Sequence, residues 1–304
     1  MRNSPNRSRL PISFPLRGVN LQIITIIILP LTIILVAVTF GSLSLHQQAM
    51  RTLVGERDER AARTAAGALG DHIKFRLLLV QNLSLLAASA GDLQLGSTLE
   101  SSRSMLNEFD GGLAFFSPDG ALLAAQGDQD FWEQLADSKI ELAVPLSPEV
   151  IRSFSPHTSI RVFPSERGNM VVLTAWQPDE GTITAGAFSI ENLASKSLKP
   201  TISSNQDTSI FLVDADYQLL YQKGEFLPDL AGRDHVGISS ALDGMSGTTF
   251  QVNDGIEHVV AYSHVETMGW ALVIEEPWEA VTNPMLRTTG FAPLVLVPVL
   301  LLAL

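Results

Sequence analysis

The sequence has no cysteine among its 304 residues. This absence excludes a small scaffold held by disulfides, and it excludes zinc sites built on thiolates. The chain is also poor in positive charge, with 20 Lys and Arg against 32 Asp and Glu and a net charge of −12. The sequence also has no stripe of basic residues that could contact phosphates. For both reasons we expect no nucleic-acid partner. The 46% hydrophobic content excludes a disordered chain.

Charge of either sign is missing from Val19 to Leu45, and the run from Ile23 to Phe40 within it is dense in Ile, Leu and Val. Such a run is long enough to cross a bilayer as a helix. A cleavable signal peptide is the alternative, but its apolar region is usually about 7 to 15 residues long and ends at a small-x-small site. Four arginines and no acid precede the run. The positive-inside rule therefore predicts a cytoplasmic N-terminus at residues 1–18, a transmembrane helix at 19–45, and the remainder outside.

The last residues, Phe291 to Leu304, also lack charged side chains. As a helix they would span only ~21 Å, which is short of a bilayer core of ~30 Å. We interpret residues 287–304 as the start of a second transmembrane helix, truncated in this sequence. A partial anchor on the membrane surface and a buried terminal helix of a soluble domain are the alternatives.

Proline is missing from residues 46–98. Apolar residues recur there at steps of three and four, with charged residues between them, which predicts a long stalk helix. A break near Gly67 or Gly70 is the alternative, since glycine costs only about 1 kcal/mol in a helix. A helix of this length is too long for one small domain to cover. Part of it is therefore expected to pair with a second copy, as a homodimer, or to stand free.

Beyond Leu99, short apolar runs punctuated by Gly, Pro, Asp and Asn predict β-strands. Residues 113–127 and 209–224 share one pattern: an apolar strand, a turn with Asp or Gly, and a second apolar strand. A second pair of strands recurs in residues 170–190 and 258–275. The duplication predicts an α+β fold with two tandem modules built on antiparallel sheets, at residues 99–198 and 199–286.

The second module carries the most specific runs, which are FLVDAD at 211–216, LAGRD at 230–234, ALDGMSG at 241–247 and GWALVIEEP at 269–277. Together with the long helix and the two apolar segments, these runs resemble the double Cache (dCache, PAS-like) extracellular sensor region of bacterial transmembrane receptors of the sensor histidine kinase type. The resemblance covers residues 20–304.

The resemblance implies a membrane signal-transduction receptor. Its membrane-distal module, residues 99–198, would bind a small molecule outside the cell or in the periplasm, and residues 199–286 would form the membrane-proximal module. The conformational change would pass through the helices to a cytoplasmic output domain beyond Leu304. No enzymatic motif such as G-x-S-x-G, a P-loop or H-E-x-x-H is present, so we expect no enzyme. The alternatives are a membrane-anchored extracellular enzyme and a structural or protein-interaction module.

Five residues of the first module are candidate ligand contacts: Phe131, Trp132, Arg152, Arg161 and Trp176. Amino-acid-binding members of the resembled family carry an arginine and an aromatic pair after the first hairpin, and this chain keeps only the aromatic pair. Aromatic side chains orient ligands by shape, and an arginine can bind a carboxylate or a phosphate in bidentate fashion. The alternatives are an aromatic pair in the core, surface arginines paired with acids, and a packed strand tryptophan.

Two further sets of polar residues have simpler interpretations. Asp119, Asp214 and Asp216 fall in predicted hairpin turns, where Asp ordinarily bonds to its own backbone. His258 and His264 are six residues apart on one strand face, but a metal site needs three or four converging ligands. We therefore interpret these histidines as exposed strand residues, and we expect no metal and no cofactor. The expected partners are a small-molecule ligand, the lipid bilayer and a second copy.

Overall fold

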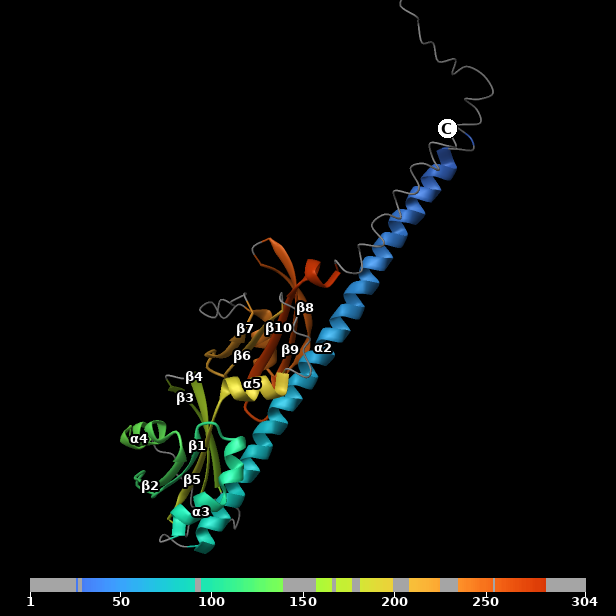
Figure 1. The fold of residues 1–304 in the computed structure, drawn as a ribbon. Coiled ribbons are helices and arrows are strands. Elements are labelled where there is room, and N and C mark those ends of the chain that lie inside the picture. Colours follow the sequence, from blue (N-terminus) through green and yellow to red (C-terminus); the bar gives the residue numbers. More distant parts are fainter. Residues whose placement is uncertain are drawn as a thin grey trace, which may run out of the picture. The chain divides into compact units, whose positions relative to one another are not determined.

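The computed structural model describes residues 26, 29–90, 94–138, 157–165, 168–176, 181–198, 208–224, 235–253 and 255–282. The chain divides into two compact units, one of Met1–Leu53 with Thr288–Leu304 and one of Val54–Arg287. The second unit holds two five-stranded antiparallel sheets and most of one long helix (Figure 1). The predicted α+β class with two PAS-like modules is therefore confirmed.

The long helix is α2, Leu29–Ala90, with 62 residues. It confirms the predicted stalk helix as far as Ala90, and a separate short helix, α3 (Leu95–Ser101), follows. The alternative of a break near Gly67 or Gly70 is excluded, because both glycines lie inside α2. Among the described residues α2 is the one helix long and apolar enough to cross a membrane. The predicted second transmembrane helix lies outside the described residues.

Sheet A has the strand order β2-β1-β5-β4-β3. Its elements follow η3 (Arg103–Asn107) and are β1 (Gly112–Phe116), β2 (Leu122–Gly127), α4 (Gln129–Asp137), β3 (His157–Ser165), β4 (Gly168–Trp176), β5 (Ile183–Ser189) and α5 (Ile190–Leu198). The predicted hairpin is β1–β2, and the predicted second pair is β4–β5. The edge strand β3 was not predicted, because it carries polar residues on both faces and a proline, which edge strands tolerate.

Sheet B repeats this arrangement with the order β7-β6-β10-β9-β8. Its elements are β6 (Ser209–Val213), β7 (Leu219–Lys223), α6 (Val236–Leu242), β8 (Ser246–Asn253), β9 (Ile256–Val265) and β10 (Trp270–Pro277). The same order in both sheets confirms the internal duplication. The edge strand β8 was also missing from the prediction.

The main core lies between α2 and one face of each sheet. It includes Leu69, Ile73 and Leu83 of α2, Phe115 and Leu173 of sheet A, and Leu212 and Leu272 of sheet B. Eight buried positions of α2 form two series with a seven-residue spacing: Ala62, Leu69, Arg76 and Leu83, and Ala66, Ile73, Val80 and Ala87. This spacing keeps both series on one face of the helix. The opposite face of sheet A packs against α4 and that of sheet B against α6.

One position of the buried face of α2 carries a charge. Arg76 is fully buried, and its Nε donates to the carbonyl oxygen of Glu108 at 2.8 Å. Its Nη2 donates to Asn192 Oδ1 at 3.3 Å and lies 3.3 Å from Glu108 Oε2, while the guanidinium lies 4.3 Å from the centre of the Phe188 ring. Desolvation lowers the pKa of Arg76. These bonds join α2 to the turn before β1 and to α5.

A second set of polar contacts joins α2 to sheet B. The Nη2 of Arg57 donates to Glu276 Oε2 at 3.2 Å, and Thr208 Oγ1 donates to Glu276 Oε1 at 2.7 Å. The Oγ1 of Thr248 donates to the carbonyl oxygen of Gly55 at 2.8 Å. The carboxyl of Asp58 is buried beside Arg57, and desolvation raises its pKa. The end of β10 is thereby held on α2.

We predict that Arg76→Ala lowers the free energy of unfolding by about 3 kcal/mol, because it leaves a cavity and removes the buried charged bonds. The exposed Arg60 of the same helix pairs with Glu56 one turn away. Arg60→Ala is the control and should cost no more than about 0.5 kcal/mol. Urea unfolding followed by tryptophan fluorescence measures both. Equal losses in the two variants would show that Arg76 does not hold α2 in place.

Candidate functional site

The face of sheet A that packs against α4 brings together four of the five candidate ligand contacts. Trp176 of β4 lies opposite His157 of β3 and Ile183 of β5. Four residues along, Arg161 of β3 lies opposite Val172 of β4. Residues opposite each other in a ladder share a face, and Trp176, Ile183 and Val172 belong to the cluster that holds the α4 aromatics. The fifth candidate, Arg152, lies outside the described residues.

Helix α4 is placed on this face by its sequence. Asp128 caps it, with Oδ1 accepting from the Phe131 N–H at 3.3 Å. The helix then buries Phe131, Trp132 and Leu135 on one side. The Trp132 ring lies 5.2 Å from that of Phe131 and 5.9 Å from that of Phe116 on β1, both edge-on. The aromatic pair is thus packed on the sheet, as the core alternative expects, and forms a wall of the cluster.

Two buried polar atoms on this face have no hydrogen-bond partner among the described residues. They are the indole Nε1 of Trp132 and Nε2 of His157. The His157 ring lies 5.8 Å from that of Trp176. Buried indole and imidazole nitrogens ordinarily find a partner, so both can bond to a ligand or to water. His157 escaped the sequence analysis because only the register of β3 on β4 places it beside Trp176.

Arg161 is half-buried and has no acidic partner in the part of the chain that the structure describes. The alternative that Arg161 is a surface arginine paired with an acid is therefore not seen among the described residues, although the chain has 32 Asp and Glu. The same face of the sheet carries three small side chains, Ala114, Ala185 and Ala187, beside the larger Val172 and Met170. A guanidinium and two ring nitrogens without partners among the described residues, together with an aromatic wall, suit a ligand with a carboxylate and an apolar body.

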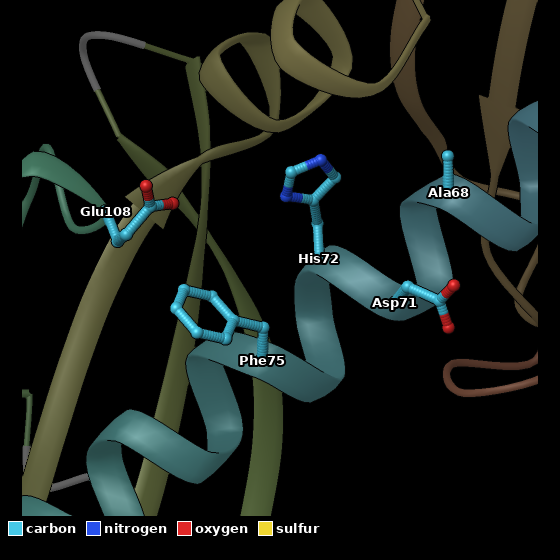
Figure 2. Close-up of a pocket in the computed structure, with 5 residues that line it drawn as sticks. All are labelled: Ala68, Asp71, His72, Phe75 and Glu108. Atoms are coloured by element: carbon cyan, nitrogen blue, oxygen red, sulfur yellow. The ribbon is translucent and has the colours of Figure 1, made fainter.

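A groove of about 420 Å³ lies on the other side of the module, along α2. It is lined by Ala68, Asp71, His72 and Phe75 of α2 and by Glu108 across from them (Figure 2). Glu108 is already engaged by Arg76 and by Lys196, whose Nζ lies 3.4 Å away. Phe75 is 50% exposed. None of the candidate ligand contacts lines this groove.

Two other interpretations of polar residues were made from the sequence. The interpretation of the Asp residues as turn residues is confirmed, and the interpretation of the two histidines as exposed is wrong. Asp214 is a turn residue, since its Oδ1 accepts from the N–H groups of Asp216 and Gln218 at 2.9 and 2.8 Å. The Asp119 carboxylate accepts from the Ser117 hydroxyl, which lowers the pKa of Asp119. His258, in contrast, is buried rather than exposed, and His264 is half-buried. Among the described residues no group of three His, Cys, Asp or Glu side chains could hold a metal ion.

Solved structures with this architecture are bacterial sensory domains. The ligand-binding domain of the Campylobacter jejuni chemoreceptor Tlp3 with L-valine has a TM-score of 0.52 and 11% identity, covering 80% of this chain and 98% of that chain. The extracellular domain of mmHK1S-Z3, described as a histidine kinase, has a TM-score of 0.51 and 13% identity, covering 76% and 97%. The chain has the double Cache fold. No protein-family model and no curated protein sequence matches it.

The resemblance found in the sequence is thus confirmed at the level of the fold. Its specific runs fall on defined parts of sheet B: residues 211–216 span β6 and its turn, 241–247 join α6 to β8, and 269–277 form β10. Sheet A belongs to the first module of the chain. The sensory domain of Tlp3 has been solved with isoleucine bound.

We predict that Arg161→Met changes the free energy of unfolding by less than about 0.5 kcal/mol, because no described acid depends on this guanidinium. Trp132→Ala should lose about 3–5 kcal/mol, since it empties a fully buried aromatic position. Urea unfolding of both variants tests the distinction between a ligand contact and a structural residue. A loss above about 2 kcal/mol in Arg161→Met would assign that arginine a structural role.

Proposed function

We propose that this chain is the ligand-sensing region of a bacterial membrane receptor, and that its distal module, residues 99–198, binds a small carboxylic acid. The observation that carries the proposal is the half-buried Arg161, which has no acidic partner among the described residues. It lies on the same sheet face as the nitrogens of Trp132 and His157, which have no hydrogen-bond partner among those residues either. Phe131 and Trp176 belong to the same aromatic cluster, and Arg152 is proposed as a second cation for the ligand. Tlp3, with the same fold, has been solved with isoleucine and with L-valine, which makes amino acids the first class to test.

The signal would travel through α2. A ligand transmits only if it binds two conformations with different affinity. Helix α2 packs on both sheets, Arg76 joins it to the distal module, and Arg57 joins it to β10. We propose that residues 19–45 anchor the chain in the bilayer with residues 1–18 in the cytoplasm. Residues 287–304 would begin a second span that leads to a cytoplasmic output domain.

A second copy is the proposed partner of the exposed face of α2. Phe75, Leu78, Leu85 and Leu86 are each about half exposed, at 50%, 57%, 47% and 49%. Phe75, Leu78 and Leu85 follow at steps of three and seven, and Leu86 lies eleven residues after Phe75, which places all four on one face of the helix, as in a helix-pairing seam. The 420 Å³ groove beside Phe75 continues this face and would receive a side chain of the second helix. Apolar exposure of this extent on a monomer indicates an interaction surface.

The ligand proposal is tested by thermal shift of the purified full chain in detergent, with amino acids and other small carboxylic acids as probes. At a hundred times its dissociation constant a ligand adds about 2.7 kcal/mol of stability, which raises Tm measurably. Arg161→Met should weaken binding of a positive probe roughly ten- to hundredfold, because a charged hydrogen-bonded contact is lost. Arg60→Met, on α2, is the matched control and should bind normally. No shift with any acid, or equal weakening by both variants, would contradict the proposal.

The absence of cysteine makes the dimer directly testable. A single Leu78→Cys substitution should give an intermolecular disulfide on mild oxidation of the chain in membranes, since the two helices would meet at this position. Glu133→Cys places a thiol at an exposed position of α4, away from the proposed seam, and should stay monomeric on a non-reducing gel. Equal yields of dimer from both variants would mean random collision.

A further inference from the structure

A second groove, of about 400 Å³, lies between α2 and one end of sheet B. One wall is a stripe of α2 from Arg63 to Lys74, and its lining positions share one face of the helix. The other wall is the start of β8, at residues 244–246, and the end of β9 with the turn that follows it, at residues 263–267. We call this hollow the sheet B groove. No described candidate ligand contact of the first module lines it.

Gly67 leaves the sheet B groove open on the α2 side. It is exposed, and outside its own helix no described atom lies within 4 Å of the position that a β-carbon would take. Gly70 is different, because a β-carbon there would lie 3.1 Å from Thr267 Oγ1. Glycine is unfavourable inside a helix. The close approach of the β9–β10 turn explains Gly70, whereas at Gly67 the missing side chain only leaves space in the groove.

Three charged side chains of the groove have no ion-pair partner among the residues that the structure describes. They are Asp71 and Lys74 of α2 and Glu266 of the β9–β10 turn. The fourth charged residue, Arg63, is already bonded to Glu59, with Nη2 2.5 Å from Oε1. The charges that remain for a ligand are therefore two negative and one positive.

The sheet wall of the groove also offers hydrogen-bond acceptors. The hydroxyl oxygens of Ser246 and Ser263 lie 2.9 Å apart and share one hydrogen bond, which leaves lone pairs on both. His264 Nδ1 donates to the Ala241 carbonyl oxygen at 2.8 Å, so the neutral ring has its acceptor at Nε2. Together with the carboxylate of Glu266, these groups make a wall that suits an ammonium donor.

We propose that the sheet B groove binds a small diamino acid. Such a molecule carries two ammonium groups and one carboxylate, which complement the free charges of Asp71, Glu266 and Lys74. The groove lies within the size range of small-molecule sites. Because its two walls belong to α2 and to sheet B, a ligand between them favours the arrangement in which they keep this spacing. This site is separate from the proposed ligand face of sheet A and does not depend on it.

The test is the rise in Tm of the full chain in detergent as L-ornithine is added. The natural chain should gain about 5 °C at a hundred times the dissociation constant. Gly67→Gln fills the groove with an uncharged side chain and should weaken binding at least tenfold. Its ligand-free Tm should not fall, because glutamine favours a helix more than glycine does. The matched control is Gly96→Gln, at an exposed glycine of α3 with open space around it, which should bind normally.

Two further variants identify the contacts and the site. Lys74→Met should weaken binding of L-ornithine about fivefold and should not weaken binding of putrescine, a diamine without a carboxylate. Arg161→Met alters the proposed ligand face of sheet A and should leave the binding of L-ornithine to the groove unchanged.

The proposal is overturned by the absence of any rise with L-ornithine, by equal loss in Gly67→Gln and Gly96→Gln, or by equal weakening of both probes in Lys74→Met. It is also overturned by a rise that Arg161→Met abolishes and Gly67→Gln keeps. That last result would assign the ligand to sheet A, so a failure of this proposal is distinguishable from a failure of the proposed function.

Discussion

The packing of α2 against both sheets is the constraint on which the rest of this structure depends. Each sheet leaves one apolar face that must be covered, and a single helix face with seven-residue spacing covers both. The two modules therefore share one core along α2, and each has a smaller core of its own on the opposite face of its sheet. The opposite faces are left to short local helices, α4 on sheet A and α6 on sheet B.

Two sets of polar contacts join α2 to the two modules at different places along the helix. Arg76 occupies a position in the buried series where an apolar residue would be expected, and its bonds reach the turn before β1 and α5. Arg57 is exposed at the other end and reaches β10 through Glu276. The first contact fixes the helix in a low-dielectric core, where a charged bond is strong, and the second lies near solvent, where it is weaker. Of these two polar contacts, the one to the sheet A module is therefore the stronger.

Local patterns explain what the sequence predicts well. The steps of three and four in α2, the Asp turn at Asp214 and the hairpins β1–β2 and β6–β7 each depend on residues close in the chain. The edge strands β3 and β8 have mixed polarity, and they can be recognised only from their pairing with the neighbouring strands β4 and β9. For the same reason His157, which meets Trp176 through register, was missed, and His258 was wrongly interpreted as exposed. Its burial depends on Glu275, seventeen residues away on the next strand.

The seven-residue spacing of α2 has a consequence for how this chain can vary in length. One residue inserted between Leu69 and Leu83 would turn every later side chain by about 100°. Val80 and Leu83 would then leave sheet A, although each sheet would be unaltered in its own sequence. An insertion of seven residues turns the helix by two nearly whole turns and restores the face. Related chains of different length should therefore differ in this segment by multiples of seven, with the distance between the two sheets changing in steps of two helical turns.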